Sequence, residues 1–539
     1  MLRPRPLFLA LPLLLLGLAC QSPSSPPSPA APSSPPANDY TVVRLTPSLS
    51  ALSDAEMAAA PALIEAAQAM DAIFWEQAYG NRDSLLQTLS DSLQRRAVRL
   101  NYGPWNRLRH DAPLLDAVGP RPPGANFYPT DLSPDALRRA DTLRTPHTMV
   151  RRLPDGSLTA LPYHLFFAES VTSAAFQLRD AAAQMPAGAV RTSLSRRADA
   201  LLDGAYGPGA EAWHALTAPA LDLLLGPMNT GEDRLLGVKE AAAGVVLRRN
   251  DAQSRRLAPL LAPLPGRLSI RGLDTLVAPR AVPTQKWGAY DALYVTGGLN
   301  TGPKATVLPL APTGPRRLLL ANVLRARADR LLRPTARNGL VDAQQAAVTA
   351  EALFAHTALR TWSRARLPDP PPGDRAAAVR TTATATALAL ALALAPSDTT
   401  GGAAGASAHY ATAVADLLHT VRVDSTSRDG RAARRLLHLL QDAGALTARD
   451  DGPYAVVADT MARRLPALVR TLSAGRPAAT TDAGADGPVP LSPALQAVLS
   501  RLEAAGVPRG LAFEQGPAVL RSLEAAAGAT PNAPRPTGR

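Results

Sequence analysis

Hydrophobic residues recur at helical intervals along most of the chain. From 61 to 100 they are spaced three and four residues apart, with one interruption at Gly80, and the same spacing returns from 433 to 446. Gly444 lies near the end of the second run, where a glycine commonly terminates a helix. These intervals predict long amphipathic helices in both halves of the chain.

Strand signals are few by comparison. Two runs rich in β-branched and aromatic residues, 291–298 and 304–310, are separated by a short stretch with Gly, Asn and Pro. Two such runs joined by turn residues predict a β-hairpin. Together with the helical spacing, they predict a mixed α/β fold that is mostly α.

The run at 380–396 carries two conflicting signals. Thr or Leu alternates with Ala, and a period of two is typical of a strand. Alanine and leucine are nevertheless strong helix formers, and the run is too short and too weakly apolar to span a membrane comfortably. We expect a buried helix here.

The N-terminal segment, residues 1–20, resembles a secretory signal. Arg3 and Arg5 precede a short apolar run, and small residues follow it up to Cys20. The residues just before Cys20 are similar to a bacterial lipobox, which predicts lipidation of the Cys20 thiol. Residues 21–40 are rich in Pro and Ser and predict an extended tether. We therefore expect an exported protein that is lipid-anchored to the cell envelope, at the periplasmic face of the outer membrane.

The remaining chain is too long for one compact core. Residues 41–527 exceed the size at which a single hydrophobic core stops growing, so two lobes are expected. Stretches at 367–374 and 473–490 are rich in Pro, Gly or Asp and predict loops. Residues 528–539 predict a disordered tail.

The positive charge of the chain does not indicate a nucleic-acid partner. The net charge is +13, but lysine occurs only at Lys239, Lys286 and Lys304, so nearly all of the positive charge is arginine. The arginines are scattered, aromatic residues make up only 4% of the chain, and no nucleic-acid-binding module is recognisable. We expect a solvated basic surface instead.

The stretch from about 345 to 395 lacks the pattern of a metal site. A hydrolytic zinc site needs imidazoles about one helical turn apart, a third ligand and a carboxylate beside the bound water. No glutamate occurs between Glu351 and Glu503. The histidines in that interval are not spaced as two ligands on one helical face; they are His356, His409, His419 and His438.

Five separated blocks of sequence occur in the order found in one peptidase family. The first is Gly-Ala-Asn-Phe-Tyr-Pro (124–129), followed by Asp131. Over roughly residues 100–510 the chain resembles bacterial members of the dipeptidyl peptidase III family of zinc metallopeptidases. The other four blocks are GPMNTGEDRLLGVKEAA (226–242), AYDALYVTGGLNTGPKAT (289–306), GPRRLLLANVLRARADRLLRP (314–334) and LSPALQAVLSRLEAAGVP (491–508).

The resemblance implies a two-lobed metallopeptidase-like fold whose catalytic groups have been replaced. Its lobes would be a helical one and one containing a small β-barrel, with a cleft between them. In the family's register the two zinc histidines fall on Arg360 and Arg364, and the general-base glutamate falls on Thr361. The carboxylate pair that supplies the third ligand falls on Thr386 and Ala387. We therefore predict a degenerate member with no catalytic residue, no metal ligand and no cofactor.

The predicted function is accordingly non-catalytic. We expect an envelope lipoprotein that binds peptides or an envelope protein, or acts as a scaffold. The alternative is an active zinc-dependent dipeptidyl peptidase with non-standard ligands such as His356 and His409. A structural envelope protein that never binds peptide is a third interpretation.

Candidate cleft or anion-binding residues follow from the same register. Asn229 begins the Asn-Thr-Gly that replaces the family's peptide-gripping Glu-Thr-Tyr, and Asn300 and Asn322 match polar positions of the family's cleft. Arg360 and Arg364 lie four residues apart, on one face of a helix. Buried guanidiniums need partners, so this pair points to solvent, forms ion pairs with acidic side chains, or binds an anionic ligand such as a peptide carboxylate.

Overall fold

The structure of the protein is a computed structural model. The signal segment, Cys20, most of the tether and the tail at 528–539 lie outside the residues that it describes. The chain divides after Pro35, and every described residue belongs to the second unit, Pro36–Arg539. The described residues are 39–45, 49–116, 118–138, 140–266, 282–309, 314–367, 375–391, 400–448, 452–473 and 490–515.

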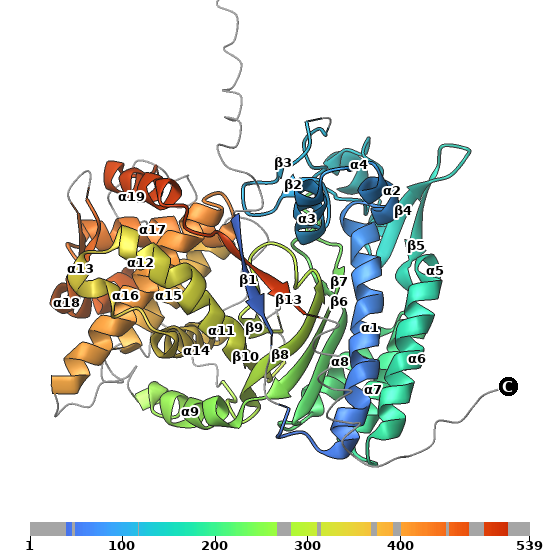
Figure 1. The fold of residues 1–539 in the computed structure, drawn as a ribbon, viewed down its shortest axis with the longest axis horizontal. Coiled ribbons are helices and arrows are strands. Elements are labelled where there is room, and N and C mark those ends of the chain that lie inside the picture. Colours follow the sequence, from blue (N-terminus) through green and yellow to red (C-terminus); the bar gives the residue numbers. More distant parts are fainter. Residues whose placement is uncertain are drawn as a thin grey trace, which may run out of the picture. The chain divides into compact units, whose positions relative to one another are not determined.

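The first long helix is α1 (Asp54–Ala78), which stands against the sheet (Figure 1). Ser53 caps it: the Ser53 hydroxyl accepts the N–H of Glu56, and the Glu56 carboxylate accepts the N–H of Ser53. Gly80, at φ 123°, turns the chain away from α1. The predicted interruption at Gly80 is confirmed. Two shorter helices follow, α2 (Arg82–Gln87) and α3 (Ser92–Asn101).

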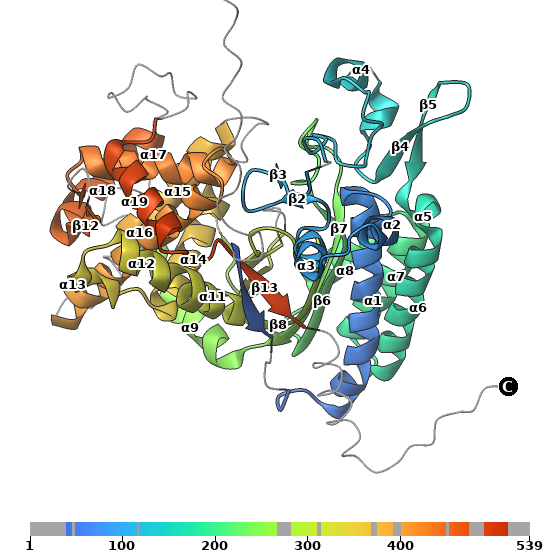
Figure 2. The same ribbon diagram turned by 45° about the horizontal axis from the view of Figure 1, so that its top comes forward.

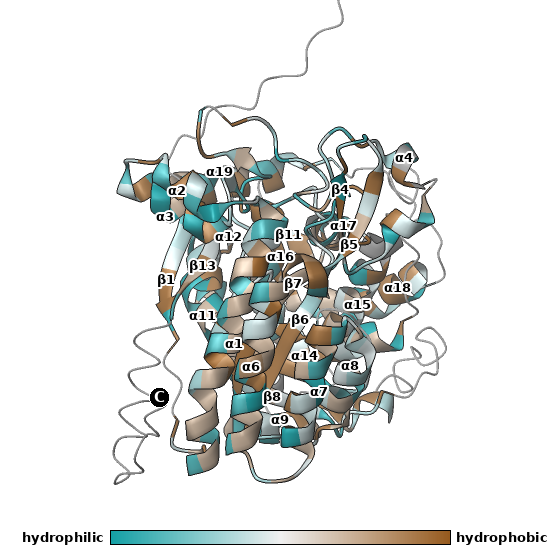
Figure 3. Ribbon diagram, turned by 90° about the vertical axis from the view of Figure 1, so that its right-hand side faces the viewer, coloured by the Kyte–Doolittle hydropathy of each residue, from teal (hydrophilic) through white to brown (hydrophobic). Residues whose placement is uncertain are grey.

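Three helices extend the layer that α1 begins. Helix α6 (Ala168–Gln184) packs on α1, α7 (Ala189–Asp203) packs on α6, and α8 (Tyr206–Ala215) packs on α7. Figure 3 shows α1 and α6 side by side in front of the sheet. Shorter elements nearby are β2 (Trp105–Asn106), β3 (Ala112–Pro113), α4 (Pro134–Arg138), η2 (Asp141–Arg144), β4 (Thr148–Arg152), β5 (Leu158–Pro162) and α5 (Tyr163–Phe166).

A five-stranded sheet lies behind α1. Its strands, in spatial order, are β6 (Leu221–Asn229), β7 (Ala241–Arg249), β8 (Trp287–Gly297), β10 (Arg317–Leu320) and β9 (Val307–Leu308). Only β8 and β10 are parallel; the other neighbouring strands are antiparallel.

Alternating side chains give the sheet two apolar faces. Leu223 and Leu225 pack into the core beneath α1, whereas Leu224 between them packs into the cluster on the opposite face. Among the described residues β6 and β9 do not pair with each other, so the sheet is an open half-barrel.

The resemblance implies a small β-barrel, and the half-barrel sheet is consistent with it, with β6 and β9 at its edges among the described residues. One prediction about the strands is corrected. The runs 291–298 and 304–310 predict a hairpin, but β10 lies between them and pairs with β8 on one side and β9 on the other. The two runs are not neighbours in the sheet because a parallel strand from further along the chain occupies the position between them.

The C-terminal half of the sequence is mainly helical, which confirms the mostly α composition. Its helices enclose a single large hydrophobic cluster that includes Leu359, Trp362 and Leu418. They are α9 (Asp251–Leu261), α11 (Ala321–Arg327), the π-helical turn η3 (Ala328–Leu332), α12 (Arg333–Gly339), α13 (Asp342–Gln345), α14 (Ala350–Arg366), α15 (Arg375–Ala391), α16 (Thr400–Val423), α17 (Arg428–Asp442), α18 (Ala458–Ser473) and α19 (Pro493–Ala504). A short ladder of β11 (Leu446–Thr447) and β12 (Ala455–Val456) lies among them.

Helix α15 confirms the predicted buried helix in the part of 380–396 that the structure describes. Residues 381–390 are buried on every side. Two threonine hydroxyls are satisfied within the helix, because Thr384 and Thr386 donate to the carbonyls of Arg380 and Thr382 at 3.0 and 2.8 Å, and Thr381 donates to the carbonyl of Ala432 in α17. A helix surrounded by protein has no polar face, and its sequence therefore carries no helical period.

The two ends of the described chain meet. Strand β1 (Tyr40–Arg44) pairs in parallel with β13 (Gly510–Glu514), and both lie between the helical half and the large sheet (Figure 2). Asp39 anchors this pair by accepting both Nε and Nη2 of Arg109 at 2.7 Å. Arg109 also donates to Glu503 at the end of α19.

Candidate functional site

Helix α14 carries the two arginines that the sequence singled out. Thr349 begins the helix as its cap, and Leu359 and Trp362 fix its orientation by packing into the helical core. Arg360 and Arg364 are left on a partly exposed side. The Arg360 side chain is 38% exposed, so its guanidinium is reachable from solvent.

An ion cluster lies beside Arg360. The Asp416 carboxylate of α16 is buried and accepts Nε and Nη2 of Arg327, at 2.8 and 2.7 Å from one oxygen. Arg360 Nη1 is 3.7 Å from the other oxygen, an ion pair without a hydrogen bond. Burial would raise the pKa of Asp416, but the Arg327 and Arg360 guanidiniums lower it well below its ordinary value. Two arginines thus face one carboxylate, and no described residue accepts a hydrogen bond from the Arg360 guanidinium.

Two buried histidines meet next to this cluster. His356 Nδ1 and His409 Nε2 are 3.1 Å apart, and the two rings are edge to face. Burial lowers the pKa of both, that of His409 to about 4. Both rings are therefore neutral near pH 7, one donating and the other accepting the hydrogen bond between them.

A second polar cluster lies where β6 and β8 end. Asn229 Nδ2 donates to the carbonyl of Gly298 at 3.0 Å, and Asn229 Oδ1 accepts the N–H of Gly231 at 2.9 Å. Asn300 Nδ2 donates to the Tyr102 hydroxyl at 3.2 Å, and Asn300 Oδ1 accepts from Lys304. Asn229 is thus bound to the turn that follows β8, and Asn300 lies in that turn.

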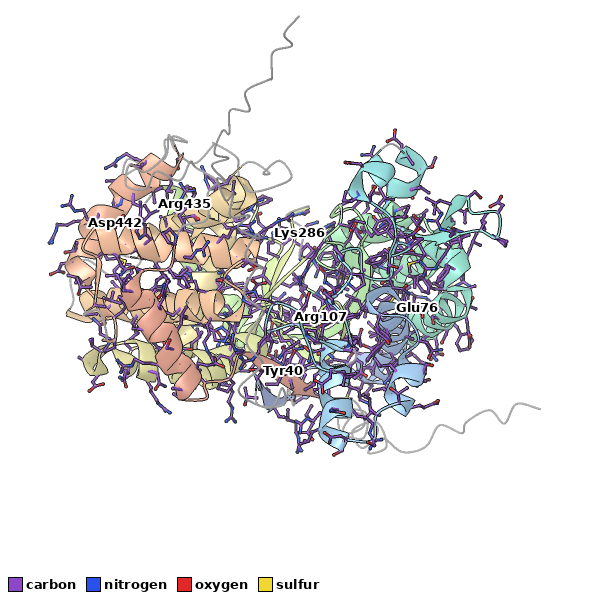
Figure 4. The ribbon with its side chains drawn as sticks, turned by 90° about the horizontal axis from the view of Figure 1, so that it is seen from above. Tyr40, Glu76, Arg107, Lys286, Arg435 and Asp442 are labelled. Carbon is purple, nitrogen blue, oxygen red and sulfur yellow. The ribbon has the colours of Figure 1, made fainter. Side chains whose placement is uncertain are left out.

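Buried arginines support the loop after Asn229. Glu232 accepts from Arg107 at 3.0 Å and from Arg121 at 2.5 Å. Burial would raise the pKa of Glu232, but these two guanidiniums lower it. In Figure 4 Arg107 lies near the middle of the molecule, between the helical half and the layer that contains α1. The ion pairs of Glu232 with Arg107 and Arg121 therefore hold the loop after Asn229 in place.

Asn322 has a different role from the other two asparagines. Its side-chain amide accepts the N–H of Ala292 and donates to the carbonyl of Ala292, both at 2.9 Å. Gln515 does the same to Val295, at 2.9 and 2.5 Å. Both amides satisfy the part of the β8 edge that β10 does not cover, in the manner of a neighbouring strand.

The five predicted residues therefore fall in three places: the arginines on α14, Asn229 and Asn300 at the turn after β8, and Asn322 on the β8 edge. Sequence reasoning missed Asp71 and Tyr102 altogether. Asp71 accepts the Tyr102 hydroxyl and the N–H of Gly297. No motif connects α1, the end of α3 and a turn more than two hundred residues later, so only the fold could reveal this cluster.

Comparisons with known proteins identify the fold. The structure of dipeptidyl-peptidase III from Corallococcus sp. strain EGB matches with a TM-score of 0.76, covering 92% of this chain and 98% of that one at 24% identity. Dipeptidyl-peptidase III from Caldithrix abyssi matches with a TM-score of 0.75, covering 90% and 99% at 21% identity. This chain has the dipeptidyl-peptidase III fold.

Sequence comparisons are less informative. No protein-family model matches the chain. Nudix hydrolase 3 of Arabidopsis thaliana is 23% identical over an alignment of 396 positions that covers 59% of this chain. The chain spans about half the length of that protein, 50%.

Zinc does not fit the residues at the place where the resemblance to dipeptidyl-peptidase III puts it. Arg360 and Arg364 cannot ligate a cation because guanidiniums are protonated at all ordinary pH values. The Thr361 hydroxyl is engaged with the carbonyl of Thr357 at 2.7 Å, and Thr386 is buried with its hydroxyl bonded inside α15. Among the described residues no group of three His, Cys, Asp or Glu side chains could hold a metal ion.

Proposed function

We propose that this protein is a lipid-anchored envelope protein that uses the dipeptidyl-peptidase III fold to bind a peptide or a protein partner without hydrolysing it. Cys20 would carry the lipid and 21–40 would form the tether. The bacterial membrane is then one partner, and peptides or an envelope protein are the other. Nucleic acid is not among the expected partners.

The observation that carries the proposal is the position of Arg360. Where the resemblance places a zinc ligand, α14 has a half-exposed guanidinium that is only 3.7 Å from a carboxylate already satisfied by Arg327. In the register of the resemblance a permanently charged cation would stand where the family has a zinc ligand, and its guanidinium is suited to a carboxylate. This supports binding of an anionic group, and the neighbouring Asp416 carboxylate is already held by Arg327.

Peptide carboxylates are the anions that best match two guanidiniums one helical turn apart. Arg360 and Arg364 could grip both oxygens of one carboxylate, or two neighbouring acidic side chains. The competing interpretation is that both arginines serve only to hold the helical half together. Arg360 would then do so through Asp416, and Arg364 through contacts such as the one with the Leu367 carbonyl at 3.4 Å.

The test has two arms. Elemental analysis and a dipeptidyl-substrate assay, with and without a chelator, should find neither stoichiometric zinc nor hydrolysis. Titration calorimetry with acidic peptides should show binding that Arg360→Gln combined with Arg364→Gln abolishes at nearly unchanged melting temperature. Arg463→Gln with Arg464→Gln, an exposed pair on α18, is the matched control. A large loss of stability with unchanged binding would assign the α14 arginines to the fold alone.

A second candidate function, a zinc-dependent dipeptidyl peptidase with unusual ligands, is favoured by the contact between His356 and His409. Two imidazole nitrogens 3.1 Å apart could in principle share a metal ion. Both rings are buried, however, and a hydrolytic zinc ion needs a third protein ligand. Near-equimolar zinc that is lost in His409→Ala, with chelator-sensitive hydrolysis, would establish this function and overturn the first.

A further inference from the structure

Three enclosed N–H groups near the end of α16 lack an acceptor among the described residues. They are His419 Nε2, Arg422 Nε and Arg509 Nε. His419 and Arg422 are three residues apart on one face of α16, and both are buried. Arg509 directly precedes β13, and its guanidinium donates to the Arg422 carbonyl. Enclosed donors without an acceptor are uncommon in folded proteins, where a bound ion or water otherwise supplies the acceptor.

The single proton of the His419 ring is on Nε2. Arg327 Nη2 lies 3.4 Å from His419 Nδ1, and because a guanidinium can only donate, Nδ1 is the acceptor. Burial lowers the pKa of His419 well below its ordinary value, and the charges of Arg327, Arg422 and Arg509 lower it further. The ring is therefore neutral near pH 7, and its Nε2–H is a donor that no described residue uses.

Glu503 holds the two other donors beside each other. Its Oε2 accepts Arg422 Nη2 at 3.0 Å and Arg509 Nη2 at 2.8 Å. Arg422 Nη1 donates to the carbonyl of Pro508 at 3.4 Å. Asp39 Oδ1 is 3.6 Å from Arg509 Nε, which is too far for a hydrogen bond. Both guanidiniums are thus fixed through their outer nitrogens, and both Nε–H groups are left without an acceptor.

Positive charge exceeds negative charge in this part of the molecule. Five arginines share three carboxylates; the arginines are Arg109, Arg327, Arg360, Arg422 and Arg509, and the carboxylates are Asp39, Asp416 and Glu503. Asp424, which follows α16, is held by His110 and Thr426 instead. The described groups therefore carry a partly buried excess of positive charge, and such an excess is costly unless a counter-ion balances it.

We propose that the protein binds a chloride ion at His419 Nε2, Arg422 Nε and Arg509 Nε. Chloride accepts several hydrogen bonds, donates none and balances part of the excess charge. A water molecule would instead add two hydrogens that need acceptors of their own. Because the three nitrogens are enclosed, a monatomic ion suits them better than a carboxylate or phosphate group. The side chains of Glu503 and Arg509 are 30% and 12% exposed, so the cluster reaches solvent on that side.

The inference goes beyond the proposed function, because neither a peptide nor zinc takes part in it. The first measurement is the melting temperature of the full chain in sodium chloride, sodium bromide and sodium gluconate at equal ionic strength. Chloride and bromide should raise the melting temperature by about 2 °C or more over gluconate, since a ligand that binds only the folded state stabilises it. Equal ionic strength cancels the general screening of surface charges.

His419→Leu removes the Nε2 donor and should abolish the difference between the salts. His419→Gln should retain part of that difference, because its amide can accept from Arg327 and still donate to the ion. His438→Gln is the control, since this histidine lies on α17 with 27% of its side chain exposed, and it should respond like wild type. An equal effect of chloride on wild type and His419→Leu would overturn the inference.

Bromide soaked into crystals of wild type gives a direct measurement that does not depend on any variant. An anomalous peak within hydrogen-bond distance of the three nitrogens would support the inference. It decides the question even if His419→Leu does not fold. If bromide is absent from this position, or binds only elsewhere on the surface, the inference is wrong whatever the salts do to the melting temperature.

Discussion

The buried pair of His356 and His409 predicts a loss of stability in mild acid. The ordinary pKa of histidine is about 6.5, and burial lowers that of His409 to about 4. Between these values the unfolded chain binds a proton at this position and the folded protein does not. The stabilisation is fully present above pH 6.5 and is lost as the pH falls to 4.

The magnitude follows from the same two values. Each unit of pKa corresponds to about 1.36 kcal/mol, so His409 alone should contribute about 3 kcal/mol to the pH dependence. His356 adds to this, because burial and the neighbouring His409 and Arg360 charges lower its pKa too. Glu503, whose pKa is lowered to about 2, loses its contribution as the pH falls from about 4.5 to 2, and this loss is common to wild type and the variant compared below.

The assay compares wild type with His409→Gln in urea unfolding at pH values from 7 to 4. A glutamine side chain can still donate or accept a hydrogen bond with His356, but it does not titrate. The comparison also cancels the titration of Asp71 and Asp222, whose raised pKa values act in the opposite direction. Trp362, buried in α14, reports unfolding of this region by fluorescence.

Wild type should lose about 3 kcal/mol more than His409→Gln between pH 6.5 and 4. His438→Gln is the control, since this histidine lies on α17 with 27% of its side chain exposed. The reasoning would be refuted if wild type and His409→Gln lost stability in parallel across this range.

Three further predictions concern the sheet edge, the central helix and the anchor. Gln515→Leu removes both hydrogen bonds to Val295 and should cost about 1–3 kcal/mol; hydrogen exchange should speed up at β8, and unchanged exchange there would contradict the edge assignment. Leu388→Ala should cost about 2–5 kcal/mol because the side chain is fully buried; a cost below about 1 kcal/mol in urea unfolding would mean that α15 is loosely packed. Cys20→Ser should release the protein from membranes or stall signal processing, and fractionation identical to wild type would disprove lipid anchoring.

Local sequence patterns predicted individual helices and their ends better than they predicted which strands pair. The break at Gly80 and the helix within 433–446 depend on neighbouring residues and on glycine chemistry, and the structure has both, with Gly444 at φ 66° beyond α17. Strand pairing depends on residues far along the chain. The hairpin prediction was wrong because nothing between 291 and 310 indicates that β10 will enter between the two strands.

The candidate site was predictable only where a block of sequence marks it. The resemblance located Arg360 and Arg364 on one helix, which the structure has as α14. It could not identify Asp416 or Arg327 as the neighbours of Arg360, because they come from separate helices. The sequence could not indicate Asp71 for the same reason, because its hydrogen bond with Gly297 joins residues 226 positions apart.

Pairing β1 with β13 sets an order of events during synthesis. Arg44 and Glu514, bonded to each other, are 470 residues apart. At about 5–20 residues per second, β1 waits roughly 25–90 s for its partner to be made. During that time the strand exposes unpaired backbone that another chain could bind. A nascent chain that stops before residue 510 leaves Tyr40–Arg44 without its partner strand, however well the intervening helices have already folded.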